Sequence, residues 1–259
     1  MQVTIPVLEI EAFILVVFRV GGIFFFAPVF GGRNIPMPIR AALALWLAFS
    51  FYPMVDPTSI PHPDDGIGLT FAIFTEFTIG VLIGIIGQVI SAAVQFGGSI
   101  LGKHMGFRIA NVFDPSFAGS VSLLGAFMNI ATLLLLLTFD FHLILLQVIA
   151  KSYELIPPLT AQLRLGVIEI LLRMGANIYM FAIQIVFPVL AAIFFVEIII
   201  GVMAKTARQF NMLMLQFPIK IAVGLIFFVA LLKGFPDAIA MMLEEVLDQI
   251  RMLLKIMSP

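Results

Sequence analysis

Four ionisable residues lie within strongly apolar stretches of this 259-residue sequence, and their types could carry chemistry. In chain order they are Arg19 in VVFRVGG, Glu76 in IFTEFTIG, Glu197 in IFFVEIII and Lys220 in FPIKIAVG. A charged side chain costs about 2.5–3.5 kcal/mol at the centre of a bilayer, even on the most lenient scale. Two acids and two bases are therefore expected either to pair between helices or subunits, or to form a site for an ion or a proton.

Other kinds of chemistry have little basis in the sequence. There is no Cys, which excludes disulfides, thiolate metal sites and cysteine nucleophiles. The three histidines, His62, His104 and His142, are far apart and lack the spacing of metal ligands. No Gly-rich phosphate loop or Ser–His arrangement is present, and a net charge of −1 gives no electrostatic attraction to nucleic acid. We expect neither an enzyme nor a cofactor-binding protein.

The composition is that of an integral membrane protein. Hydrophobic residues make up 62% of the chain and charged residues 11%, against about a quarter charged in soluble domains. A spanning helix needs about 20 apolar residues, and six stretches approach or exceed this length: 10–31, 39–55, 67–102, 119–149, 175–204 and 210–233. The third and fourth are too long for one upright span, so tilted or broken helices are expected.

These patterns predict an all-α, polytopic membrane protein of about six long, kinked apolar helices packed as hairpins. Pro28, Pro188 and Pro218 fall inside apolar stretches and are expected to kink them. A C-terminal amphipathic helix is expected to begin at Pro236. Its polar face is as acidic as it is basic, which favours docking against a protein partner over lying on anionic lipid. Its apolar face would hold Ile239, Met242, Leu243, Val246, Ile250, Leu253 and Met257.

Glycines at fourfold spacing lead into an unusual segment. Gly80 and Gly84 are followed by Gly98, Gly102 and Gly106, a spacing that places small residues on one helix face and favours close helix packing. The next segment, HMGFRIANVFDPSFAGS at 104–120, combines loop residues with three Phe. A solvated turn does not need such aromatic bulk.

The distribution of basic residues half obeys the positive-inside rule. The connections at 32–40, 103–110 and 204–209 are basic, whereas 56–66 holds three Asp and no Lys or Arg, which places both termini outside. The segment 150–174 does not fit, because its three basic residues would also face outward. The chain is therefore not expected to insert as a simple six-span bundle.

Three motifs together resemble the FliR/SpaR family of flagellar and virulence type III secretion export-gate proteins. They are FRVGGIFFFAPVFGGRNIPMPIRAALAL, EFTIGVLIG and ARQFNMLMLQFPIKIAVGL. Arg208 departs from the pattern, since the family usually has Pro there. The residues that match the family signature most closely are Pro28, Arg40, Gln209, Asn211, Pro218 and Gly224, and the ionisable residues Arg19, Glu76 and Lys220 also fall on it.

The resemblance implies a subunit of an export gate in the bacterial inner membrane, within the flagellar basal body, with part of the chain above the membrane plane. FliP- and FliQ-type subunits would complete the closed pore for unfolded export substrates, and an FlhB-type subunit would wrap its outside. The resemblance also implies that the segment after the third long helix plugs the pore. The residues of this plug would be Phe107, Arg108, Ile109, Ala110, Asn111, Val112, Phe113, Asp114, Pro115, Ser116 and Phe117.

The expected organisation is one domain, 1–259, with N-terminal helices at 1–102, the plug loop at 103–120, further helices at 121–234 and the amphipathic helix at 235–259. Two rival interpretations remain open. A secondary ion-coupled transporter would use Glu76, Glu197 and Lys220, and would show internal repeats. A purely structural scaffold would tolerate replacement of the loop by Gly and Ser.

Overall fold

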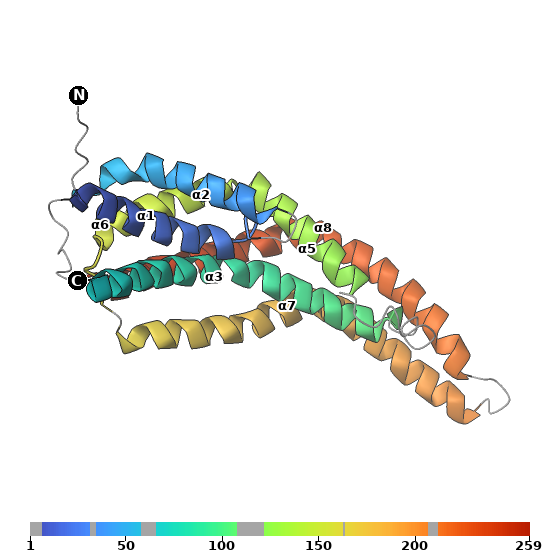
Figure 1. The fold of residues 1–259 in the computed structure, drawn as a ribbon. Coiled ribbons are helices and arrows are strands. Elements are labelled where there is room, and N and C mark those ends of the chain that lie inside the picture. The colour runs from blue at the N-terminus through green and yellow to red at the C-terminus, as the bar shows by residue number, and fades with distance from the viewer. Residues whose placement is uncertain (1–6, 32–34, 58–65, 108–121, 163, 207–211) are drawn as a thin grey trace. The chain divides into compact units, whose positions relative to one another are not determined.

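The computed structural model describes residues 7–31, 35–57, 66–107, 122–162, 164–206 and 212–259. Its helices are α1 (Val7–Phe26), α2 (Met37–Phe51), α3 (Gly66–His104), α5 (Leu123–Thr138), α6 (Phe141–Leu155), α7 (Leu165–Thr206) and α8 (Met212–Met257), with a short 3-10 helix η1 (Tyr52–Met54). Figure 1 shows them in chain order from blue to red. No strand occurs among the described residues, so the predicted all-α class is confirmed.

The two longest apolar stretches behave differently. The stretch 67–102 forms one unbroken helix of 39 residues. The stretch 119–149 is broken, because α5 and α6 meet at a bend of 65°. Asp140, at this break, has φ 55°, a left-handed conformation that cannot continue a helix.

Four segments of the described chain are long and apolar enough to cross a membrane, or five if α5 and α6 form one bent span. A polytopic membrane protein is therefore confirmed. The first predicted span, 10–31, is not among them. Every 18-residue window of α1 contains Glu9, Glu11 and Arg19, and three charges raise the cost of a spanning position.

Two prolines do not have the effect on helices that the sequence predicts. Pro28 does not kink a helix, since α1 ends at Phe26 and Pro28 lies in the following turn. A proline disfavours the helical conformation of the residue before it, so it ends the helix. Pro236 does not begin a separate helix, because α8 continues through it to Met257. Pro188 and Pro218 lie inside α7 and α8, and the kinks expected at them stay a prediction.

The chain forms two compact units. Unit 1 contains Met1–Val89, Leu136–Met174 and Glu244–Pro259, and unit 2 contains Ile90–Leu135 and Gly175–Leu243. The helices α3, α5, α7 and α8 each contribute residues to both units.

Glycines let α1 and α3 touch backbone to backbone in unit 1. A Cβ added at Gly22 would lie 2.6 Å from the carbonyl oxygen of Phe77, and one added at Gly80 would meet the carbonyl oxygen of Arg19. Gly84 faces Ile23 in the same way. Such contact lets dispersion forces act over the whole crossing, and the tight packing predicted from the glycine spacing is present.

Unit 2 repeats this arrangement between α3 and α5. A Cβ added at Gly98 would lie 2.6 Å from the Cα of Gly125. One added at Gly102 would meet the hydroxyl oxygen of Ser122. The glycine series of α3 therefore faces α1 in one unit and α5 in the other.

The apolar face of the C-terminal helical segment is already buried within the chain. Each of its seven predicted residues is at most 6% exposed: Ile239, Met242, Leu243, Val246, Ile250, Leu253 and Met257. The expectation that this face docks against a partner is therefore wrong. Other residues of the same chain cover this apolar stripe, and only the polar face and the flanks of the helix remain exposed.

Two neighbouring glycines of α1 provide a matched test of the close helix contact. Gly22→Ala should destabilise the protein by about 1–3 kcal/mol, because its methyl group must displace α3 backbone. Gly21→Ala is the control, since a Cβ there meets nothing within 4 Å. The alanine should be neutral or stabilise α1 by up to about 1 kcal/mol. Thermal unfolding in detergent measures both, and equal effects would contradict the packing described.

Candidate functional site

Arg19 of α1 and Glu76 of α3 meet in the interior of unit 1, and both side chains are fully buried. The Nε of Arg19 donates to Oε2 of Glu76. The Nη1 of Arg19 donates to two backbone carbonyl oxygens at the end of α6, those of Ser152 at 3.1 Å and Ile156 at 2.8 Å. One guanidinium therefore joins α1, α3 and α6.

The second oxygen of Glu76 holds a turn. Its Oε1 accepts a hydrogen bond of 3.0 Å from the backbone N–H of Leu159. Leu159 has φ 67°, and the N–H of Thr160 donates to the carbonyl oxygen of Pro157 across the turn. Pro at the second position and positive φ at the third are typical of a type II turn, where Gly is the usual residue. The carboxylate thus supports a conformation that costs leucine energy.

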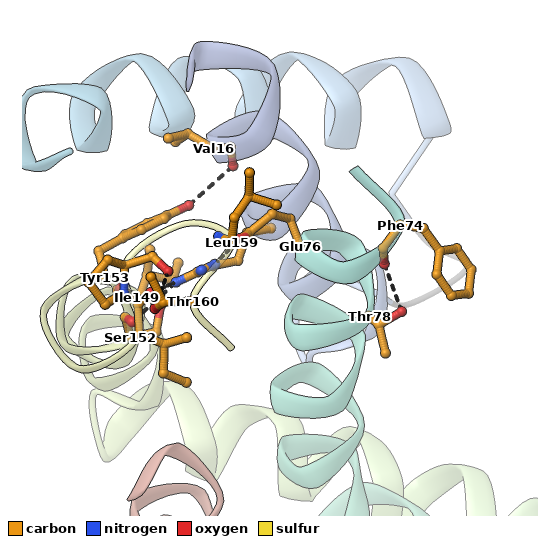
Figure 2. A network of polar contacts seen from close by, with 12 residues as sticks. Val16, Phe74, Glu76, Thr78, Ile149, Ser152, Tyr153, Leu159 and Thr160 are labelled. Carbon is orange, nitrogen blue, oxygen red and sulfur yellow. Dashed lines mark hydrogen bonds and ion pairs between the residues drawn. The ribbon is translucent and has the colours of Figure 1, made fainter. Parts of the chain in front are cut away.

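Tyr153 closes the network on its remaining side. Its ring centroid lies 4.5 Å from the Cζ of Arg19, and its hydroxyl donates to the carbonyl oxygen of Val16 at 3.3 Å. Figure 2 shows Leu159 beside Glu76, Tyr153 and Ser152 on the other side of the network, and the dashed bond from Tyr153 to Val16. The cation gains from the aromatic face as well as from the carboxylate.

This geometry suits a structural role better than ion transport. Both oxygens of Glu76 accept hydrogen bonds from protein donors held by the fold. Both side chains are fully buried, so Glu76 has no free oxygen for a passing ion. The Nη2 of Arg19 is the one guanidinium nitrogen without a partner among the described residues. The expected pairing between two helices is present, and both side chains are buried.

Glu197 of α7 and Lys220 of α8 form the second expected pair, in unit 2. The Nζ of Lys220 donates to Oε1 of Glu197 at 2.8 Å. The lysine side chain is 13% exposed and the glutamate side chain 39%. This pair is therefore partly open on the surface of the chain, unlike the first, and other molecules can reach the carboxylate.

The N-terminal end of the predicted plug is anchored on α8, within unit 2. Met105 is fully buried, and its side chain lies against Gly224, where an added Cβ would be 2.6 Å from the Met105 Cε. Gly106 has φ 86°, which turns the chain out of α3. The ring of Phe217 lies 3.0 Å from the position of a Cβ on Gly106. Two residues of the predicted motif, Phe217 and Gly224, thus receive the end of α3.

The C-terminal end of the same segment returns to α3. The hydroxyl of Ser122 donates to the carbonyl oxygen of Gly98 at 3.2 Å and accepts from the N–H of Gly125 at 3.4 Å. The second bond is of the kind that caps a helix start, here that of α5. Both ends of the segment are therefore held within unit 2 by contacts among α3, α5 and α8.

Of the predicted plug residues, Phe107 is described and is half-buried. The others lie outside the described residues: Arg108, Ile109, Ala110, Asn111, Val112, Phe113, Asp114, Pro115, Ser116 and Phe117.

The remaining signature residues are structural where they are described. Arg40, in the first turn of α2, donates from Nε to the carbonyl oxygen of Ile35 at 3.0 Å and from Nη1 to that of Gly31 at 3.4 Å. It thereby ties α2 to the residues that follow α1. Gln209 and Asn211 lie outside the described residues.

Sequence reasoning missed the groups that complete the buried network. The carbonyl acceptors at Ser152 and Ile156 belong to the backbone, which carries no residue-type signal. The turn at 157–160 had a signal in the Pro157–Pro158 dipeptide. Nothing in the sequence, however, places that turn beside Glu76.

Removing one partner of the buried pair should be far more harmful than removing both. Arg19→Met should lower the free energy of unfolding by about 3–5 kcal/mol, because it leaves a buried carboxylate uncompensated. Adding Glu76→Met should recover much of this loss, since the double variant buries no lone charge. Denaturant unfolding in mixed micelles measures both variants. A double variant less stable than Arg19→Met would contradict this account.

Comparison with known proteins places both sites within one family. The model of the family described as bacterial export proteins, family 1, matches residues 10–246. The flagellar biosynthetic protein FliR of Bacillus subtilis is 33% identical over 219 residues, covering 83% of each chain. The proteins of the same name from Escherichia coli and Caulobacter vibrioides are 26% and 25% identical, over 80% and 90% of this chain and 78% and 93% of their own. The matched range includes Arg19, Glu76, Glu197 and Lys220, and the chain belongs to family 1 of the bacterial export proteins.

Proposed function

We propose that this chain is a FliR-type subunit of the flagellar type III secretion export gate. The observation that carries the proposal is the family match over residues 10–246, joined by relatives that are named for flagellar biosynthesis. The chain is not an enzyme, because the family to which it belongs is one of export proteins. In this role it conducts unfolded export substrates and transforms none of them.

The plug segment supplies the closure of the pore in this proposal. Its anchors support the idea, because Met105 and Gly106 hold one end on α8 and Ser122 holds the other on α3. A segment fixed at both ends can close a channel without being lost from it. Phe107, Phe113 and Phe117 would provide apolar bulk that excludes water and ions. Gly106, at positive φ, would act as the hinge.

The proposed partners are FliP-, FliQ- and FlhB-type subunits. Large exposed apolar side chains along α7 support an assembly or lipid contact there, among them Leu172, Phe187, Phe194, Phe195 and Ile199. Large apolar side chains exposed in such numbers are typical of contact with protein or lipid. Glu197 of the partly exposed Glu197–Lys220 pair lies on the same helix, and the pair would set the register between subunits.

The proposed location is the bacterial inner membrane within the flagellar basal body, with part of the chain above the membrane plane. The helix α1 supports the second point, because its three charges make it a poor membrane span. Secondary ion-coupled transport is less favoured, since the fully buried Arg19–Glu76 pair leaves no open ion site at Glu76.

Deleting residues 107–119 should raise ion conductance through the assembled complex by removing the apolar closure. The complex with FliP- and FliQ-type subunits is reconstituted in planar bilayers, and single-channel conductance is recorded. Replacing the same residues with Gly and Ser of equal length is the matched variant, and it should leak as well because it lacks aromatic bulk. Unchanged conductance in both variants would rule out the plug role but would not affect the family assignment.

Lys220→Met should reduce recovery of the complex severalfold, since it leaves Glu197 unpaired at a proposed subunit contact. Lys233→Met is the control, because Lys233 is an exposed lysine of the same helix. Co-purification of the subunits with the tagged chain measures both, and a secretion assay follows. Intact assembly and secretion in Lys220→Met would show that the pair has no part in assembly.

A further inference from the structure

A groove of about 410 Å³ lies between α6 and the last part of α8, both within unit 1. Its volume is in the range of small-molecule sites. Three of its lining residues are cations, Lys151, Arg251 and Lys255, and none is an acid. The other lining residues are one amide and six aliphatic side chains: Gln147, Ile144, Val148, Leu155, Leu247, Ile250 and Leu254.

The groove is apolar at one end and cationic toward the other. The N–H of Gln162, beyond the end of α6, donates to the carbonyl oxygen of Met257 at 3.1 Å. Gly166 lies against Ile256 in the same region. The two helices therefore run toward the same end, and Figure 1 shows α6 and the red end of α8 near the mark of the C-terminus. Ile144 and Leu247 lie at the opposite end of the groove, one to two turns from the cations.

The cations of the groove are available to a ligand. Lys151 lies 3.7 Å from Glu154 and Arg251 lies 2.9 Å from Asp248, each on its own helix, with all four side chains more than half exposed. Exposed ion pairs of this kind contribute little energy, so a stronger anion can displace or share them. Lys255 has no acidic partner among the described residues.

We propose that this groove binds an anionic phospholipid. An acyl chain lies along Ile144, Val148 and Leu247, and the phosphate sits among Lys151, Arg251 and Lys255. Basic pockets between helices at a membrane surface bind acidic lipid head groups, and this chain has four to five candidate spans to bring it there. A free phosphate would gain nothing from the apolar end.

A helix from an acidic partner fits the groove less well. The lining of α6 from Ile144 to Leu155 extends about 16 Å at 1.5 Å per residue, whereas a helix has a diameter of about 10 Å. A volume of about 410 Å³ is smaller than the volume that a partner helix of that length and diameter would fill. A single hydrocarbon chain is thinner than a helix and needs less of this volume.

The test measures binding of dioctanoyl phosphatidylglycerol to the full chain, purified in an uncharged detergent, by microscale thermophoresis. The triple variant K151Q/R251Q/K255Q should bind on the order of 100-fold more weakly, as expected for three cations near a head group. The matched triple variant R173Q/K205Q/K233Q removes three cations outside the groove and should bind as the unaltered chain does. Dioctanoyl phosphatidylcholine should bind at least about tenfold more weakly than phosphatidylglycerol, and inorganic phosphate should not compete at millimolar concentration.

A second pair of variants tests the apolar end without changing any charge. Val148→Trp fills the groove and should weaken binding of phosphatidylglycerol about tenfold. Leu143→Trp is its control, because Leu143 is an exposed residue of α6 outside the groove. Circular dichroism establishes that each variant retains its helices.

Three results would overturn the proposal: equal affinity for the two lipids, unchanged affinity in K151Q/R251Q/K255Q, or displacement of the lipid by inorganic phosphate. A loss of partner subunits from that variant in lipid-free detergent, with lipid affinity unchanged, would assign the groove to a protein instead. The measurement uses the isolated chain, so its failure is distinguishable from failure of the proposed gate, which is read from conductance and secretion.

Discussion

The buried ion pair between Arg19 and Glu76 is the constraint on which unit 1 depends. Each charge loses its hydration in the interior, at a cost of several kilocalories per mole, and the attraction between them repays this only with further hydrogen bonds. The protein supplies those bonds from the end of α6 and from the N–H of Leu159. Satisfying two charges therefore fixes the mutual placement of three helices and one turn, including a leucine in a left-handed conformation.

Close helix contact makes this buried pair geometrically feasible. Gly22 and Gly80 bring the backbones of α1 and α3 together next to Arg19, whose side chain is fully buried. The same device recurs between Gly98 and Gly125 in unit 2, where it positions the helix ends that carry the proposed plug. Small residues therefore have two roles in this chain. They let α1 and α3 pack closely beside the buried Arg19, and they position the helix ends that flank the proposed plug.

The charged groups fall into a buried set and an exposed set, and the two sets have different roles. The Arg19–Glu76 pair is wholly internal and serves the fold. The Glu197–Lys220 pair is partly open, and the cations of the groove between α6 and α8 are mostly exposed, which suits contacts with other molecules. The proposed gate subunit needs both kinds, because its rigid frame must also meet the proposed subunits and lipid.

The sequence by itself determined the class of this protein, its family likeness, most helix ranges and the four charges that needed partners. Hydropathy, helix length and glycine spacing are local properties, so they can be read along the chain. Its errors lay at the predicted span 10–31, at Pro28, at Pro236 and in the apolar face of the last helix. A proline can end a helix or lie within it, and an apolar stripe does not show what covers it.

Only the tertiary structure decided that Arg19 reaches Glu76, 57 residues away, and the carbonyl oxygens of α6. Backbone acceptors have no signature in residue type, and the choice among distant partners is made by the packing of the whole unit.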